Sequence, residues 1–149
     1  MPLILRVRLK RAGEAEERAI ETSAQANTGY LSGNAMLPEI YLPLSLAERL
    51  GFDVGKARRD FYAAMRGRVE ALILGDVEVR VVVPDRDTPW VKAVAITVPG
   101  GRPYAIISAE LLHFLNVAVV DTMGLGLWAF RDELGRRVRE GVPLELWPS

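Results

Sequence analysis

The stretch ANTGYLSGNAMLPEIYLPLSLAERLG, residues 26–51, decides the fold. It opens on the tripeptide Asn-Thr-Gly at 27–29, which suits a turn because Asn and Gly tolerate the left-handed backbone region. A short apolar segment follows at 37–43. The next residues have a helical pattern, with Ser45 as a candidate N-cap and Gly51 as the residue that ends the helix. The stretch therefore predicts a strand end, a turn, a second strand and a short helix.

Alternating or continuous apolar patterns predict strands through most of the remaining chain. Strands are expected at residues 3–10, 18–22, 69–74, 77–83, 91–98, 104–107, 117–121 and 125–130. The first two and the last two should each form a hairpin, and Gly75-Asp76 resembles a tight turn between the third and fourth. Ser108 is a candidate N-cap for a second short helix at 109–115, which Asn116 would end.

These elements predict a single domain over residues 1–149 that is all-β with two short helices. Residues 54–66 fit either a helix or a loop, and we expect residues 54–67 to be the most mobile part of the chain. Gly100-Gly101 is predicted to be a hairpin tip. The basic cluster at 136–139 is predicted to be a solvated tail, because acidic residues flank it.

Composition excludes several classes of function. The chain has 19 basic and 19 acidic residues, so it lacks the positive charge that attracts nucleic acid or anionic lipid. It has no cysteine, and its one histidine, His113, cannot hold a metal by itself, so we expect no metal or other cofactor. No apolar run reaches the roughly 20 residues of a membrane span, and the N-terminus lacks a signal-peptide pattern. We expect a cytoplasmic protein that binds neither nucleic acid nor membrane.

Three segments in this order resemble the retropepsin-like, single-domain aspartic proteases. Asn-Thr-Gly at 27–29 matches the catalytic Asp-Thr/Ser-Gly, residues 42–51 match the Pro-bearing strand and helix, and residues 106–112 match the apolar pair before the last helix. The resemblance implies a closed, acid-protease-like β-barrel and a homodimer that builds one cleft from two chains. It also places Asn27, Thr28 and Gly29 at the catalytic position, with Tyr30 and Ser108 as substrate-binding residues.

The resemblance also predicts a defect in catalysis. Acid proteolysis needs two carboxyl groups that share a proton, whereas Asn27 has no titratable proton and its amide oxygen is a weak base. Ser108 stands where the family usually has Gly, which adds bulk beside the turn. We therefore expect a degenerate site that holds a peptide or protein ligand and does not cleave it by the usual chemistry.

Two other functions remain open from the sequence. An active aspartic endopeptidase would need another acid in the cleft, such as Asp85, Asp87 or Asp121. Alternatively, the tripeptide is an ordinary turn, and the chain is a non-enzymatic assembly module with a different β-barrel fold. Asp121 begins an Asp-Thr-Met-Gly sequence that is itself best interpreted as a plain turn.

Overall fold

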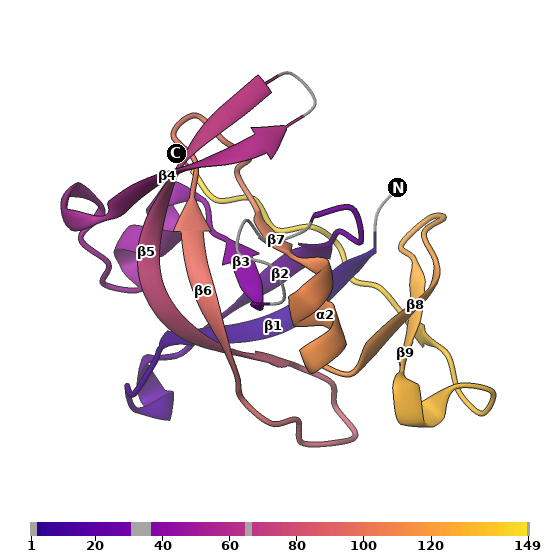
Figure 1. Ribbon diagram of the computed structural model, residues 1–149. Helices are drawn as coiled ribbons and strands as arrows, with labels where there is room; N and C mark the ends of the chain where they lie inside the picture. Colours follow the sequence, from indigo (N-terminus) through magenta and orange to yellow (C-terminus); the bar gives the residue numbers. More distant parts are fainter. Residues whose placement is uncertain (1–2, 31–36, 65–66, 149) are drawn as a thin grey trace.

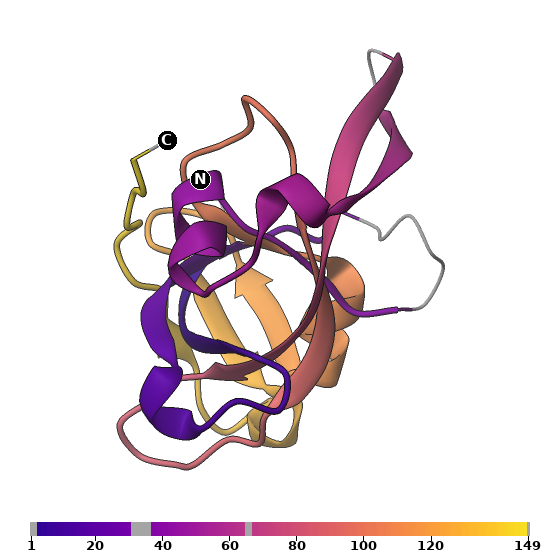
Figure 2. The ribbon, with the colours of Figure 1, turned by 90° about the vertical axis from the view of Figure 1, so that its left-hand side faces the viewer.

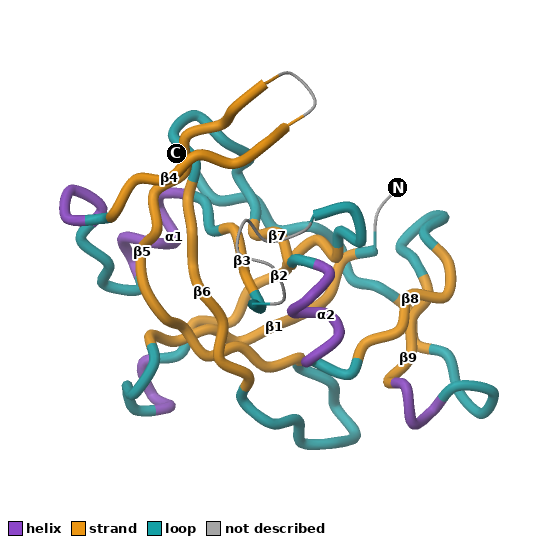
Figure 3. The backbone as a smooth tube through the Cα atoms, in the orientation of Figure 1, coloured by secondary structure: helices purple, strands orange, loops and turns teal. Residues whose placement is uncertain are grey.

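The computed structural model describes residues 3–30, 37–64 and 67–148. Its strands are β1 (Ile4–Arg11), β2 (Ile20–Ala26), β3 (Glu39–Tyr41), β4 (Arg58–Ala64), β5 (Gly67–Val81), β6 (Val91–Thr97), β7 (Ala105–Ile107), β8 (Val117–Asp121), β9 (Leu127–Phe130) and β10 (Arg139–Glu140). Its helices are α1 (Leu44–Arg49) and α2 (Ala109–Phe114), with 3₁₀ turns η1 (Glu16–Arg18), η2 (Val54–Lys56) and η3 (Arg131–Glu133). The all-β class with two short helices is therefore confirmed (Figure 3).

A closed β-barrel forms the body of the molecule (Figures 1 and 2). The strand order is β1-β2-β7-β3-β6-β5-β4, and a further β1–β5 pairing closes the barrel and leaves β4 outside it. The pairs β2–β7 and β3–β6 are parallel, and the other pairs are antiparallel. The predicted barrel is confirmed, and its parallel pairs bring segments that are far apart in the sequence into contact.

The barrel interior follows from the alternation within each strand. In β1, Leu5, Val7 and Leu9 are fully or almost fully buried, whereas Arg6 and Arg8 between them are partly exposed. Period-two alternation places every second side chain on the core face. The same core receives side chains from all six barrel strands and from both helices.

Strand β5 corrects the prediction of a hairpin at Gly75-Asp76. The backbone continues through Gly75 as one strand, and the register against β6 shifts between Ile73 and Gly75. Gly75 has a φ of 145°, and a Cβ there would lie 3.2 Å from the Phe52 ring. A bulge at a glycine bends the strand instead of reversing it. The first part of β5 can therefore pair with β4 outside the barrel, while the second part pairs with β1 inside it.

Two further local predictions were wrong. Ser45 is not the N-cap of α1. The helix begins at Leu44 with Pro43 as its N-cap, and the Ser45 hydroxyl has no partner among the described residues. Gly100-Gly101 is not a hairpin tip, because β3 lies between β6 and β7. Gly101 instead passes so close to the Tyr41 hydroxyl that a Cβ would collide with it.

The residues after α2 form a separate three-stranded sheet in the order β10-β9-β8, beside the barrel (Figure 1). The predicted hairpin of β8 and β9 is confirmed, with Val117 opposite Phe130. The predicted solvated tail is wrong at Arg139, which is 7% exposed. Its guanidinium lies 5.7 Å from the Trp128 ring centroid and 5.2 Å from that of Phe130, so packing against aromatic rings holds it.

Residues 54–66, which the sequence left open, contain η2 and all of β4. Residues 65–66 lie outside the described residues. The expected mobility of 54–67 stays a prediction. In the described part of the chain, neither helix has the length and apolar character needed to cross a membrane.

Candidate functional site

The Asn27 turn lies where β2 ends. The Asn27 backbone N–H donates to the Ile107 carbonyl at 3.2 Å, and the Tyr30 N–H donates to the Asn27 carbonyl at 3.1 Å. The Asn27 side-chain Oδ1 accepts the Gly29 N–H at 2.9 Å, which is the pattern of an Asx turn. Thr28 and Gly29 are exposed, and Asn27 is partly exposed. The tripeptide is therefore a hydrogen-bonded turn that offers polar groups to solvent.

Three strand ends meet at this turn. Strand β7 runs parallel to β2, with Ile107 opposite Ala26, and it pairs on its other side with β3. Ser108, directly after β7, is fully buried, and its hydroxyl accepts the Glu39 N–H at 3.1 Å and the Leu111 N–H at 3.2 Å. The Ser108 N–H in turn donates to the Glu39 carbonyl at 3.1 Å. The hydroxyl thus joins α2 to β3 beneath the turn.

Ser108 and Tyr30, the two predicted substrate-binding residues, differ in their exposure to solvent. Ser108 caps α2, as the sequence predicted, and its burial means that it shapes the turn from behind. Tyr30 is partly exposed, and its carbonyl accepts the Ala109 N–H at 2.8 Å. Of the two residues predicted to bind a ligand, Tyr30 is partly exposed to solvent, whereas Ser108 is buried. Ligand binding by either residue stays a prediction.

Glu39 is the residue at this site that the sequence analysis missed. Its side chain is 2% exposed, and a carboxylate oxygen accepts a hydrogen bond from the Tyr30 hydroxyl. A buried carboxyl group requires such partners, because desolvation without them is costly. The signal in the sequence was a single acidic residue within the otherwise apolar segment 37–43.

A second apolar cluster borders the site on the outer face of the sheet. Ile40 and Ile107 point into the barrel core, whereas their neighbours Tyr41 and Ile106 belong to this second cluster with Ile96. Tyr30 packs against the same cluster. This alternation gives the sheet a second, smaller buried cluster, and the partly exposed Tyr30, directly after the Asn27 turn, lies at its border.

A pocket of about 140 Å³ opens near the same part of the sheet. Its walls include Tyr41 from β3, Leu72 from β5, the loop after Val98 and the side chain of Trp147. The Tyr41 hydroxyl donates to the Arg102 carbonyl at 2.7 Å, which fixes that loop. The pocket is mostly apolar and has the size of one amino-acid side chain, so it suits an apolar group.

The β4–β5 hairpin projects away from the barrel in two perpendicular views (Figures 1 and 2). Strand β4 pairs with β5, from Arg58 opposite Ile73 to Ala64 opposite Gly67. Among the described strands, nothing pairs with the other side of β4. Its backbone groups on that side are therefore available to an extended chain.

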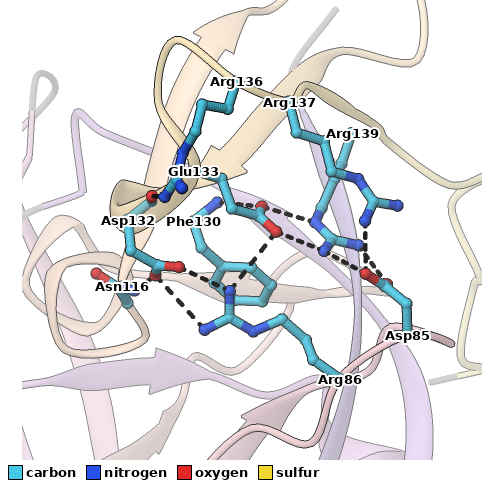
Figure 4. A network of polar contacts seen from close by, with 9 residues as sticks. All are labelled: Asp85, Arg86, Asn116, Phe130, Asp132, Glu133, Arg136, Arg137 and Arg139. Carbon is cyan, nitrogen blue, oxygen red and sulfur yellow. Dashed lines mark hydrogen bonds and ion pairs between the residues drawn. The ribbon is translucent and has the colours of Figure 1, made fainter.

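The three acids considered as substitutes lie in other parts of the fold. Asp85 and Asp87 belong to the connection between β5 and β6, and Asp121 ends β8, where its Oδ1 accepts the Met123 N–H at 2.9 Å. Asp85 accepts two hydrogen bonds from Arg139, at 2.7 and 2.9 Å, and one from Arg137 at 2.6 Å (Figure 4). These contacts, chiefly that with Arg139, hold the pKa of the Asp85 carboxyl far below its ordinary value.

The same network includes two more acids (Figure 4). Arg139 donates to Glu133 at 2.9 and 2.7 Å, which lowers the pKa of Glu133 to about 2. Arg86 donates to Asp132 at 3.0 Å and lowers its pKa. Strong ion pairs of this kind stabilise structure, and they leave no proton to share near neutral pH.

Among residues 3–30, 37–64 and 67–148, no three histidine, aspartate or glutamate side chains lie close enough together to hold a metal ion. His113 lies near the end of α2, with its ring edge-on to Phe114 at 5.3 Å between centroids.

Comparison of the sequence with protein-family models and with curated proteins finds no match.

Proposed function

We propose that this chain is a retropepsin-like homodimer that binds extended peptide and does not cleave it. The observation that carries the proposal is the turn at the end of β2. It presents the amide of Asn27, whose oxygen accepts the Gly29 N–H at 2.9 Å, and the resemblance to acid proteases would assign a carboxyl group to this residue. An amide can donate and accept hydrogen bonds, but it cannot act as a general acid or base near neutral pH.

The surroundings of the turn support binding of an extended chain. The free side of β4 offers backbone hydrogen bonds, and the partly buried side chains of Tyr30 and Ile106, at the border of the second cluster, offer apolar contacts. Backbone pairing supplies affinity in such complexes, and alternate side chains in pockets supply specificity. The pocket beside Tyr41 would accept one apolar side chain.

The nearby carboxyl group, Glu39, supports the non-catalytic part of the proposal. It is buried and hydrogen-bonded to the Tyr30 hydroxyl, and so it does not face solvent beside the turn. A general base must reach the attacking water within hydrogen-bond distance. Glu39 therefore has a structural explanation: it joins Tyr30, directly after the turn, to the first residue of β3.

The test uses fluorescently labelled peptides from unfolded casein. Fluorescence anisotropy should show saturable binding, while electrophoresis shows no pepstatin-sensitive cleavage at pH 4 or pH 7. Ile106→Ser, in the apolar cluster, should weaken binding about tenfold because a buried anchor is lost. Leu144→Ser, an exposed position in the C-terminal segment, is the matched control. Absence of binding, or equal binding by both variants, would refute the proposed site.

A further inference from the structure

The outer face of the barrel places two arginines side by side. Arg8 of β1 and Arg80 of β5 lie on this face, because the residues before and after each of them are buried in the core. The antiparallel register of β1 and β5 sets Arg8 directly opposite Arg80. Opposite residues of such a pair have Cβ atoms about 5 Å apart, so two positive charges meet here.

The carboxylates beside this pair in the sheet are engaged by other cations. Glu21 of β2 lies directly opposite Arg8, but it accepts a hydrogen bond from Arg6 Nε at 2.9 Å. On the same face of β5, a Glu78 carboxylate oxygen lies 3.1 Å from Lys10 Nζ. Within residues 3–30, 37–64 and 67–148, neither arginine of the pair has a carboxylate partner. Like charges directly opposite each other destabilise a sheet, so the pair calls for an explanation beyond the fold.

An aromatic ring, rather than a carboxylate, holds the Arg80 side chain. The Arg80 guanidinium carbon lies 5.3 Å from the centroid of the Trp90 ring. The indole N–H of Trp90 donates to the exposed Glu16 at 3.3 Å, so this carboxylate is engaged as well. The Arg80 Nε is covered from solvent and has no acceptor among the described residues. A covered N–H without an acceptor costs free energy, and binding of an ion or a water is an ordinary way to satisfy it.

We propose that Arg8 and Arg80 together bind a phosphate group, as inorganic phosphate or as a phosphate ester. Each guanidinium presents a planar fork of N–H donors that matches two oxygens of an anion. A carboxylate has only two oxygens and satisfies one fork, whereas a phosphate has enough oxygens for both. The double negative charge of the phosphate would also offset the repulsion between the two guanidinium groups.

This phosphate site lies apart from the Asn27 turn. Glu21, opposite Arg8, is near the start of β2, whereas Asn27 follows the end of that strand, about 20 Å further along an extended backbone. The phosphate site also uses neither the second apolar cluster nor the free side of β4. The inference therefore goes beyond peptide binding and does not depend on it.

A titration followed by NMR at about pH 7 and constant ionic strength tests the site, with the backbone amide signals of β1 and β5 as reporters. The ligands are inorganic phosphate, glycerol 3-phosphate and acetate. The unmodified chain should bind phosphate with a dissociation constant of about 1 mM or lower, whereas acetate should bind at least about tenfold more weakly. Tighter binding of glycerol 3-phosphate would identify an ester as the ligand, and tighter binding of inorganic phosphate would identify the free ion.

Variants test the two forks separately. Arg8→Gln and Arg80→Gln should each weaken phosphate binding about tenfold, because each removes one fork and one charge. Arg80→Lys keeps the charge and removes the fork, so it should weaken binding nearly as much as Arg80→Gln. Arg49→Gln, at an exposed arginine of α1, is the matched control and should leave the dissociation constant within about twofold. Circular dichroism and melting curves should show that all four variants fold.

Four results would overturn the proposal. The first is no binding by the unmodified chain up to about 20 mM phosphate. The second is acetate binding as tight as phosphate binding, because the two forks would then not act together. The third is a double variant, Arg8→Gln with Arg80→Gln, that still binds phosphate. The fourth is equal weakening by Arg49→Gln, which would show that phosphate responds to the overall charge and not to this pair.

Discussion

Asn27 carries the strongest prediction about chemistry. Asn27→Asp replaces the amide with a carboxyl group of nearly the same shape, and the acceptor oxygen for the Gly29 N–H is retained. If two copies pair their turns, two carboxyl groups would share a proton and titrate in two coupled steps. We expect this variant to gain pepstatin-sensitive cleavage of unfolded casein at acid pH, measured by release of labelled peptides.

The control for this prediction is Asn27→Ala, which should be as inactive as the unmodified chain. Cleavage by the unmodified chain that survives Asn27→Ala would contradict the proposal, because another acid would then perform the reaction. If Asn27→Asp is also inactive, a carboxyl group at residue 27 is not sufficient to restore cleavage. The next position to change is then Ser108, because the retropepsin-like proteases that the sequence resembles usually have Gly there.

Ser108 carries a prediction about stability. Its buried hydroxyl accepts N–H groups from Glu39 and Leu111, so Ser108→Ala would remove a helix cap and leave two buried donors without a partner. The expected loss in the free energy of unfolding is about 2 kcal/mol. Ser45→Ala is the matched control, because the Ser45 hydroxyl has no described partner, and its loss should be under about 0.5 kcal/mol. Urea denaturation measures both, and equal losses would contradict the assignment.

At the level of the elements, Arg139 connects the C-terminal sheet to the barrel. It bridges Asp85, in the connection from β5 to β6, and Glu133 in η3 (Figure 4). Arg139→Met keeps much of the apolar packing and leaves both acids without their main partner. Loss of the pair with Glu133, whose side chain is 13% exposed, should cost about 2 kcal/mol in the free energy of unfolding.

Arg137→Met provides the comparison for Arg139. Arg137 also donates to Asp85, but its side chain is half exposed. Solvent screens such a pair, so the expected loss is under about 1 kcal/mol. Thermal or urea unfolding of both variants gives the difference. Similar losses would mean that Arg139 contributes no more than a surface ion pair.

Local patterns predicted the elements whose partners are close in sequence. The hairpins β1–β2 and β8–β9 and the Ser108 cap depend on neighbouring residues, and all three are confirmed. Gly75 was misinterpreted because a glycine followed by an acidic residue suits a tight turn as well as a bulge. The difference depends on Phe52, on β4 and on β1, which the local sequence does not contain.

The candidate site was predictable only in part for the same reason. The turn at Asn27 follows from its own residues, but the burial of Glu39 depends on the parallel pairing of β2 with β7 and the position of β3 beside them. Arg139 likewise appeared to be a surface charge, because its partners Asp85 and Glu133 become neighbours only when the C-terminal sheet packs on the barrel.

At the scale of the whole molecule, β5 connects the projecting β4–β5 hairpin to the barrel. Its fifteen residues pair with β4 at one end, with β6 in the middle and with β1 at the other end. The projecting hairpin and the barrel closure therefore share one strand. Gly75 is the position where this strand bends, and no residue with a Cβ fits there without meeting Phe52.

The last prediction concerns the acid stability of the whole chain. Ion pairing lowers the pKa of Asp85, Asp132 and Glu133 in the folded state, that of Glu133 from 4.5 to about 2. The unfolded chain then binds more protons than the folded chain as the pH falls, so protonation favours unfolding. The stabilisation is complete above the ordinary carboxyl pKa and is lost as the pH falls from about 4.5 to about 2. Melting temperatures should be nearly constant from about pH 5 to pH 8 and then decrease steeply below about pH 4.5.

Glu133→Gln isolates the contribution of the network to this profile. The variant should melt at a lower temperature at pH 7 and should approach the unmodified chain near pH 2, because protonation has by then removed the same charge from Glu133. Glu140→Gln is the control: this exposed carboxylate on β10 has no ion pair among the described residues, so the variant should follow the unmodified profile. A constant difference between Glu133→Gln and the unmodified chain at every pH would show that the charge of Glu133 does not stabilise the fold, and that its hydrogen bonds act independently of ionisation.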